Sequence, residues 1–297
     1  MTHSIKSWLT ATRYWSFPVS AMPVVATAAY FASRNMLGLE QIPLVLLCIL
    51  GAVILHSAGN VSSDYFDHRT GVDNQENYSV PFLVYGDFQP REYVVFATIL
   101  YIIGAAIGIA ITIITGWQLL IVGGVGVLLT AFYPWLKYHA LGDMNIFVVF
   151  GVLIILGTTW VITGSYTTDA LVLALPIGII TVAVLHANNT SDIDTDREAG
   201  IRTFAMLIGA KRSVALYKVY MVLPFLCVIG AVVAGLLSPW TLICLVALVL
   251  AVKNIRAANL FKQQGIIAMA KLDVASAQLQ LAFSTLLSVG LIIAALV

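Results

Sequence analysis

The chain has 297 residues, of which 60% are hydrophobic and 10% charged, and its mean hydropathy is +0.97. A soluble domain has about 25% charged residues, so this composition excludes a soluble protein and predicts an all-α polytopic membrane protein. The formal net charge of +1 gives no indication of nucleic-acid binding. The three cysteines fall within apolar segments, which argues against a disulfide framework.

Nine apolar segments are candidate membrane spans, because a spanning helix needs about 20 mostly apolar residues. They cover about 14–32, 42–60, 93–115, 117–134, 145–164, 170–188, 214–236, 238–254 and 276–297. The N-terminal stretch lacks the cleavage pattern of a signal peptide, so the first segment is predicted to be retained. No linker divides the chain, and we predict one domain over residues 1–297.

The basic residues predict the orientation of these spans. Fourteen of the fifteen Lys and Arg residues fall on one side of the membrane, and only Arg34 falls on the other. Since positive charge collects in cytoplasmic loops, we expect the N-terminus in the cytoplasm and the C-terminus outside. We expect an integral multi-pass protein of a bacterial cytoplasmic membrane, with both acidic clusters described next on the cytoplasmic side.

Two acidic clusters lie at the polar ends of the second and sixth predicted spans. Ten of the fourteen Asp and Glu residues lie between 64 and 92 or between 192 and 198. Clustered carboxylates beside a membrane core repel one another and are costly to dehydrate. A divalent cation that also holds a phosphorylated ligand would remove that cost. The clusters therefore indicate a site for a cation and a phosphorylated substrate.

The two clusters share one spacing, in which an Asn precedes an Asp by four residues and a second Asp follows three or four residues later. Residues with this spacing share a helix face if the helix continues through the cluster. The recurrence indicates a weak internal repeat of four-helix units. The alternative is that a short pattern recurs by chance. Oxygen donors of this kind suit Mg²⁺. We predict metal contacts from Asn60, Asp64, Asp67, Asp73, Asn188, Asp192 and Asp196.

Lys137 is the candidate basic partner of these carboxylates. It is the only Lys or Arg between Arg91 and Arg197. A lysine can act as a point charge on a phosphate oxygen. The alternative is a lysine at the membrane edge that snorkels to water. Arg202, which follows the second cluster, would bind diphosphate or simply anchor the cytoplasmic face.

Three motifs in fixed order carry a family resemblance. They are Asn60 with Asp64-Tyr65-Phe66-Asp67 and Gly71-Val72-Asp73, then Tyr133 to Lys137 with Leu141-Gly142-Asp143, then Asn188-Asn189 with Asp192, Asp196-Arg197, Gly200 and Thr203. Over nearly its whole length the chain resembles the UbiA superfamily of intramembrane aromatic prenyltransferases. Within that superfamily it is most similar to the menaquinone-pathway members, the 1,4-dihydroxy-2-naphthoate polyprenyltransferases.

The resemblance implies nine helices in a UbiA-type bundle and a Mg²⁺-dependent reaction. A polyprenyl group would pass from polyprenyl diphosphate to 1,4-dihydroxy-2-naphthoate, giving demethylmenaquinone in menaquinone biosynthesis. Asp64, Asp192 and Lys137 would be catalytic, because Mg²⁺ and a lysine stabilise the charge on the leaving diphosphate. Arg13, beside Tyr14 and Trp15, is a candidate anchor for the aromatic acceptor. Further substrate contacts are expected from Tyr133, Lys137, Tyr138, Asn189, Arg197 and Arg202.

Two departures from the family pattern concern diphosphate binding. Ile201 stands where relatives usually carry a Lys, although Arg202 follows it. The stretch 74–81 lacks the basic residue that many relatives have there. The missing contacts would come from Arg202 or Arg69, or the substrate would differ.

Other functions remain open on the sequence alone. A UbiA-type enzyme with another acceptor, such as 4-hydroxybenzoate or a lipid glycerol phosphate, would carry the same motifs. A CDP-alcohol phosphotransferase would need a Gly after its second Asp, but His68 follows Asp67. A non-enzymatic transporter would need charged or broken helices at mid-depth, of which the predicted spans show little. Prenyl chain length, the number of Mg²⁺ ions and oligomeric state are not fixed by the sequence.

Overall fold

The computed structural model describes residues 3–73 and 80–297, and every regular element in that part is a helix. The predicted all-α class is therefore confirmed for the described residues. The longer α-helices are α2 (Phe17–Ala32), α3 (Ile42–Thr70), α4 (Pro90–Thr115), α5 (Leu119–Ala131), α8 (Ile154–Thr163), α9 (Ala174–Ser191), α12 (Ala210–Val233), α13 (Leu248–Asn259) and α15 (Leu272–Leu296).

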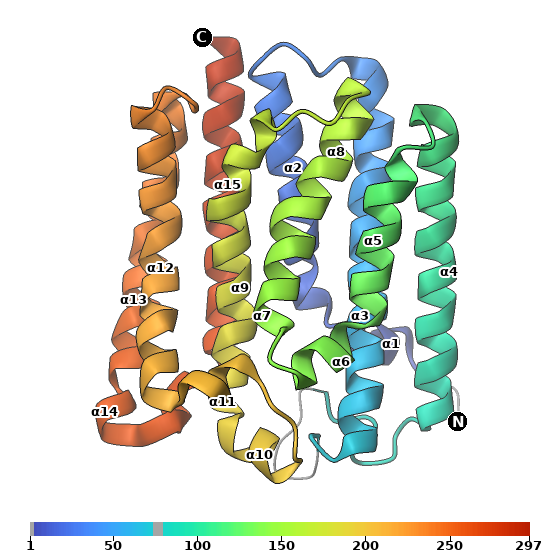
Figure 1. Cartoon of the computed structure of the whole chain (residues 1–297), viewed down its shortest axis with the longest axis vertical. Coiled ribbons are helices and arrows are strands. Elements are labelled where there is room, and N and C mark those ends of the chain that lie inside the picture. The colour runs from blue at the N-terminus through green and yellow to red at the C-terminus, as the bar shows by residue number, and fades with distance from the viewer. Residues whose placement is uncertain (1–2, 74–79) are drawn as a thin grey trace.

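Shorter elements connect these helices. The short α-helices are α1 (Ile5–Ala11), α6 (Tyr133–Tyr138), α7 (Gly142–Ile146), α10 (Ile193–Glu198), α11 (Phe204–Ile208) and α14 (Phe261–Gln264). The 3₁₀-helices are η1 (Tyr14–Ser16), η2 (Leu39–Gln41), η4 (Asp169–Leu173), η5 (Pro239–Ala247) and η6 (Gly265–Met269), and η3 (Phe147–Leu153) is a π-helix. Figure 1 shows the long helices side by side, with α6, α10, α11 and α14 gathered at the end where α3 finishes.

Seven helical segments among the described residues are long and apolar enough to cross a membrane, judged by length and composition. The predicted first and fourth spans correspond instead to α2, with 16 residues, and α5, with 13. Helix α5 ends at Ala131, and Pro134 in the first turn of α6 has no backbone N–H with which to continue the hydrogen bonding of α5. The count of nine spans, the cytoplasmic N-terminus and the single domain stay predictions. The seven segments are Leu39–Thr70, Pro90–Thr115, Gly142–Thr163, Asp169–Ser191, Ala210–Val233, Pro239–Met269 and Leu272–Leu296.

The outer surface of the bundle is apolar. Large side chains such as Ile113, Leu128 and Val249 are exposed by 80%, 59% and 74%. A water-soluble monomer rarely exposes so much contiguous apolar surface. Lipid chains would cover these side chains without penalty, so the protein is an integral multi-pass membrane protein.

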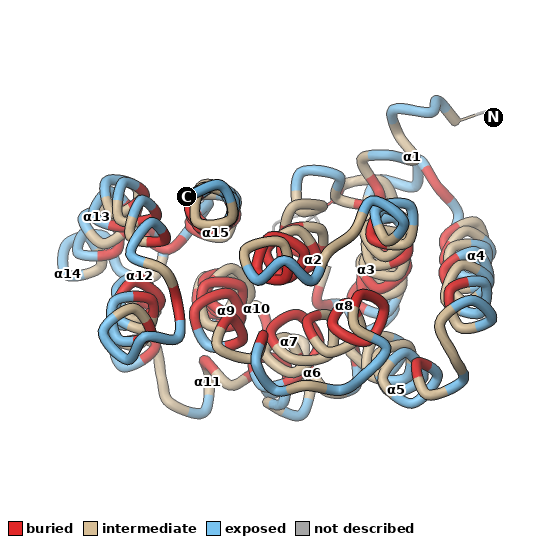
Figure 2. Tube along the Cα trace, turned by 90° about the horizontal axis from the view of Figure 1, so that it is seen from above, coloured by how far each residue is buried: buried red, intermediate tan, exposed pale blue. Residues whose placement is uncertain are grey.

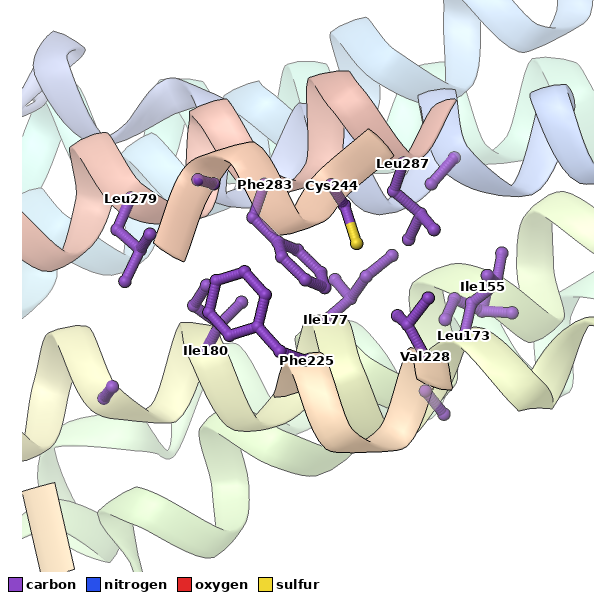
Figure 3. Packing of buried hydrophobic residues seen from close by; sticks show 14 of the residues in the cluster. Ile155, Leu173, Ile177, Ile180, Phe225, Val228, Cys244, Leu279, Phe283 and Leu287 are labelled. Carbon is purple, nitrogen blue, oxygen red and sulfur yellow. The ribbon is translucent and has the colours of Figure 1, made fainter. Parts of the chain in front are cut away.

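The main core lies between α2, α9, α12, α15 and η5. The rings of Phe225 and Phe283 meet edge to face with centroids 5.1 Å apart, and Ile177 and Cys244 lie close by (Figure 3). Figure 2 shows that α2 and α9 in the middle of the bundle are largely buried. Because lipid is as apolar as these side chains, close packing rather than dehydration stabilises such a core.

Two glycines bring the π-helix η3 against α9. A Cβ at Gly151 would lie 2.9 Å from the Cα of Gly178, and one at Gly178 would lie 2.7 Å from the ring of Phe147. Only glycine allows the two backbones this approach. The contact places the polar end of α9 beside α7 and η3, where the candidate site lies.

Candidate functional site

A polar cavity of about 150 Å³ lies between the ends of α3, α6 and α9. Side chains from both sequence motifs and from the Tyr133–Lys137 motif line it. Residues of α2, α7, η3 and α15 complete its walls. The predicted site residues that the structure brings together around this cavity are Arg13, Asn60, Asp67, Tyr133, Lys137 and Asn188.

Asn60, Asp64 and Asp67 of the first motif lie on one unbroken helix, whereas Asp73 follows its end. Helix α3 runs to Thr70 and ends at Gly71, whose φ of +80° is the left-handed conformation typical of a helix C-terminus. Asn60 and Asp67 therefore lie on the same helix and both line the cavity. The amide Nδ2 of Asn60 donates to the Thr12 carbonyl at 3.1 Å, which ties α3 to the N-terminal segment.

Arg13 forms an ion pair with Asp64. Its Nη2 donates to Oδ1 of Asp64, which is 2% exposed. Burial lowers the pKa of Arg13, but the carboxylates of Asp64 and Asp73 outweigh this and raise it above its ordinary value. Arg13 has a φ of +54°, an unfavourable left-handed conformation for a residue with a Cβ, at a cost of roughly 1–2 kcal/mol. The predicted acceptor anchor thus contacts an acidic motif residue in this structure.

Lys137 forms a second ion pair, with Asp67. Its Nζ lies 3.1 Å and 3.3 Å from the two carboxylate oxygens. The hydroxyls of Tyr138 and Ser63 also donate to this carboxylate, at 2.7 Å and 3.2 Å. Burial lowers the pKa of Lys137, but Asp67 outweighs it and the net shift is upward. Lys137 is only 6% exposed, so it does not reach water as the snorkelling alternative requires.

The second motif is divided between two helices. Helix α9 ends at Ser191, and Asp192 lies at the junction with α10, with φ −96° and ψ 7°. The expected continuous helix through Asn188, Asp192 and Asp196 is therefore interrupted, because Asp192 leaves the helical conformation. Backbone bonds of the i to i+4 type still cross the junction, at 3.0 Å and 2.8 Å. The Asn188 amide also donates to the Asp192 carboxylate at 2.8 Å.

Asp196 is a buried carboxylate. It is 1% exposed, and within residues 3–73 and 80–297 neither oxygen has a partner with full hydrogen-bond geometry, although the Thr203 side chain is near enough to lower its pKa slightly. Burial raises the pKa of its carboxyl to about 7, with Lys137 opposing the shift and Asp192 adding to it. The pKa of Asp73 is also raised to about 7, mainly by burial and further by the nearby carboxylates of Asp67 and Asp64. Both carboxyls would lose their protons more readily beside a cation.

The donor atoms of both motifs fit Mg²⁺ but do not form a preassembled centre. Among the described residues, no three His, Cys, Asp or Glu side chains are grouped closely enough to hold a metal ion. Arg13 and Lys137 instead neutralise Asp64 and Asp67. Oδ2 of Asp64 and both oxygens of Asp196 are buried and unpartnered in the described part. Such carboxylate oxygens suit Mg²⁺ that keeps some of its waters and arrives with a phosphorylated ligand.

Several predicted substrate-binding residues lie away from the cavity lining. Asn189 is buried, and its amide donates to Asp143 at 3.4 Å. Arg197 is exposed and pairs with Asp194 on the surface at 2.9 Å. Arg202 is exposed, and its backbone N–H donates to the Tyr138 carbonyl. Of the stretch lacking a basic residue, 74–79 lie outside the described residues.

Asp273, Asn145 and Thr181 are among the lining residues that were not predicted from the sequence. Asp273, at the start of α15, is the only Asp or Glu after Glu198, and this isolation is a signal that could have found it. Asn145 and Thr181 are neutral and lie within apolar segments, so the sequence offers no signal for them.

An apolar groove of about 500 Å³ adjoins the polar cavity. Helices α3, α4, α5, η3 and α8 form its walls, and almost all of its lining is hydrocarbon or glycine. The two spaces share lining residues, so they are neighbours in the bundle. The shared residues are His56, Thr130, Val149 and Phe150.

Comparison with known proteins identifies the family. Residues 20–272 match the model of the UbiA prenyltransferase family. UbiA prenyltransferase domain-containing protein 1 of Mus musculus is 33% identical over 239 residues, which cover 75% of this chain and 68% of the relative. A UbiA homologue from Aeropyrum pernix K1 in its apo form has a TM-score of 0.66 at 19% identity, covering 93% of this chain and 97% of that one. A UbiA homologue from Archaeoglobus fulgidus bound to GPP and Mg²⁺ has a TM-score of 0.56 at 12% identity, covering 95% and 99%. This chain belongs to the UbiA prenyltransferase family.

Proposed function

We propose that the protein is a Mg²⁺-dependent prenyltransferase that transfers a polyprenyl group from its diphosphate to 1,4-dihydroxy-2-naphthoate. The observation that carries this proposal is a cavity with acidic residues and two cations beside a larger apolar groove. A substrate with a charged head and a hydrocarbon tail matches these two adjoining spaces. The homologue solved with GPP and Mg²⁺ supports the same ligand chemistry.

The polar cavity would hold the diphosphate. The two motifs would supply the metal ligands, with Asp64 and Asp196 offering buried oxygens. When bound, Mg²⁺ supplies positive charge that stabilises the leaving diphosphate. Arg13 and Lys137 would turn from their carboxylates to phosphate oxygens, Arg13 through two donors and Lys137 as a point charge.

The apolar groove would hold the prenyl tail. A Cβ added at Gly108, Gly123 or Gly126 would meet no described atom within 4 Å, so these glycines widen the groove. Hydrocarbon walls exclude water from the allylic carbon, which protects a developing cation from hydrolysis. The shared residues between groove and cavity, such as Phe150, would lie beside the reacting carbon.

The proposed reaction breaks the allylic C–O bond, and its electron pair leaves with the diphosphate. The ring carbon that bears the carboxylate attacks the allylic carbon and forms the new C–C bond. Loss of CO₂ returns an electron pair to the ring, so the product is the quinol form of demethylmenaquinone.

A transfer assay tests this proposal. Purified protein in nanodiscs receives labelled polyprenyl diphosphate, Mg²⁺ and one acceptor, either 1,4-dihydroxy-2-naphthoate or 4-hydroxybenzoate. We expect demethylmenaquinol only with the naphthoate and none with EDTA. A product only with 4-hydroxybenzoate would overturn the assignment of 1,4-dihydroxy-2-naphthoate as the acceptor. Binding of prenyl diphosphate without transfer to either compound would indicate a different acceptor. No binding would overturn the enzymatic function.

We also propose that the site faces the cytoplasm of a bacterial cell. Arg34 and Arg197 provide opposite reporters, since the distribution of basic residues places them on different sides. In right-side-out vesicles, a membrane-impermeant maleimide should label an Arg34→Cys variant but not an Arg197→Cys variant. The three native cysteines lie within apolar helices, and the wild-type protein gives the background. The reverse labelling pattern would refute the orientation.

A further inference from the structure

Two neutral polar side chains that line the polar cavity each have an oxygen without a hydrogen-bond partner among the described residues. Asn145 on α7 is 6% exposed and Thr181 on α9 is 1% exposed. Among the residues that the structure describes, Oδ1 of Asn145 and Oγ1 of Thr181 have no partner. Buried polar atoms are almost always hydrogen-bonded. Two such atoms at one cavity therefore indicate a ligand that supplies the missing bonds.

Thr181 differs from two other buried helical threonines, Thr190 and Thr27. The hydroxyl of Thr159 on α8 also has no partner among the described residues, but Thr159 lines neither space. Thr190 on the same helix donates to the His186 carbonyl at 2.6 Å, and Thr27 on α2 donates to the Pro23 carbonyl at 2.7 Å. This bond to the carbonyl four residues earlier is the usual one for a helical threonine. Within the described part of the chain Thr181 makes no such bond, so its hydroxyl remains available to the cavity.

One face of α9 connects Thr181 to the diphosphate end of the cavity. Thr181, Val184, Leu185 and Asn188 all line the space, with the spacing of a single helix face. The seven residues from Thr181 to Asn188 advance about 10 Å along the helix. Thr181 therefore lies deeper than the metal motif, and the aliphatic side chains of Val184 and Leu185 between them give the cavity an apolar wall. An aromatic ring would pack against such a wall.

We propose that Asn145 and Thr181 bind a ring oxygen of the aromatic acceptor. An amide and a hydroxyl can each donate and accept a hydrogen bond, and neither carries charge. They therefore suit a neutral ring hydroxyl, whereas a carboxylate or phosphate would call for a cation. Bound there, the ring lies between the wall of α9 and Phe150, beside the prenyl groove. This inference rests on the proposed function and assigns the two residues to binding and positioning of the acceptor.

The test uses substitutions that preserve shape. In Thr181→Val and Asn145→Leu, the KM for 1,4-dihydroxy-2-naphthoate should rise about tenfold for each lost hydrogen bond. The KM for polyprenyl diphosphate should stay at its wild-type value, and Thr181→Ser should restore the acceptor KM. Thr27→Val is the matched control, because it removes a buried threonine hydroxyl outside both spaces. Calorimetric binding of the naphthoate to each protein, without prenyl diphosphate, gives a readout independent of turnover.

The outcomes separate this inference from the proposed function. Wild-type turnover combined with unchanged acceptor KM and affinity in both variants would overturn the inference and leave the function standing. Equal losses for both substrates, or an equal loss in Thr27→Val, would also overturn it, because they indicate general deformation. Absence of wild-type turnover with any acceptor would overturn the proposed function, and this inference with it.

Discussion

Substitution of Lys137 by Met tests the role of the buried ion pair with Asp67. The two charges are 3.1 Å apart, which gives about 5 kcal/mol of attraction at an effective dielectric constant of 20. Dehydration of both groups offsets much of this attraction. Breaking a buried pair by removing one partner typically costs about 3–5 kcal/mol, because the other charge stays buried. In EDTA, Lys137→Met should therefore lose about 3 kcal/mol of stability.

The same substitution should slow prenyl transfer. Removal of one group that stabilises charge on a leaving oxyanion typically lowers the rate about 100- to 1,000-fold. Single-turnover measurements with saturating Mg²⁺ and polyprenyl diphosphate would isolate this effect from binding. Tyr138→Phe is the comparison variant, since it removes the 2.7 Å hydrogen bond to Asp67 and keeps the positive charge. Its rate should fall less than about tenfold, as expected for one hydrogen bond.

A Lys137→Met rate within about threefold of wild type would refute a catalytic role for this charge. Lys137 would then serve only to neutralise Asp67 in the resting protein. Lost stability without lost rate would likewise exclude a contribution of Lys137 to the transfer step. Equal rate losses in the two variants would assign the effect to the position of Asp67 rather than to the charge of Lys137.

Three further predictions concern the metal, pH and packing. Asp64→Ala and Asp192→Ala should each abolish turnover while the protein still inserts, and near-normal activity of either purified variant would contradict the two-motif magnesium site. Burial raises the pKa of Asp196 to about 7, so protons compete with Mg²⁺ for this carboxylate below that pH. Calorimetry should find that the affinity for Mg²⁺ falls about tenfold for each pH unit below about 7. Asp196→Asn should weaken that dependence without removing it, because the pKa of Asp73 is also raised to about 7. Gly290→Val should lower stability by about 3 kcal/mol, because a Cβ there meets the backbone of η5, whereas Gly230→Ala in open space should not.

The sequence predicted the helical class and the motif residues Asn60, Asp67 and Asn188 that line the cavity, because both depend on local spacing. Asn60 and Asp67 share a face on α3, as helical periodicity requires. The same periodicity explains why Asn189 points away, since consecutive helix residues diverge by about 100° and Asn188 already faces the cavity. The motif alone could not show that the amides of Asn188 and Asn189 point to different places.

Features set by packing between distant segments were not predictable in the same way. The pairing of Arg13 with Asp64 depends on how the N-terminal segment returns to α3. The role of Asn145 depends on the contact of α7 with α9, and its neighbours in sequence are apolar. Helix α5 was predicted too long because apolar residues continue past its end at Ala131 into α6, which begins at Tyr133.

Equilibrium binding of a labelled polyprenyl diphosphate to the purified protein in nanodiscs tests the central claim most directly. We predict saturable binding with Mg²⁺ that is lost in EDTA and in Asp64→Ala. A Gly230→Ala variant, altered far from both acidic motifs in sequence, should bind like wild type. Binding that EDTA and Asp64→Ala leave unchanged, or no binding under any condition, would contradict a magnesium–diphosphate site formed by the two acidic motifs.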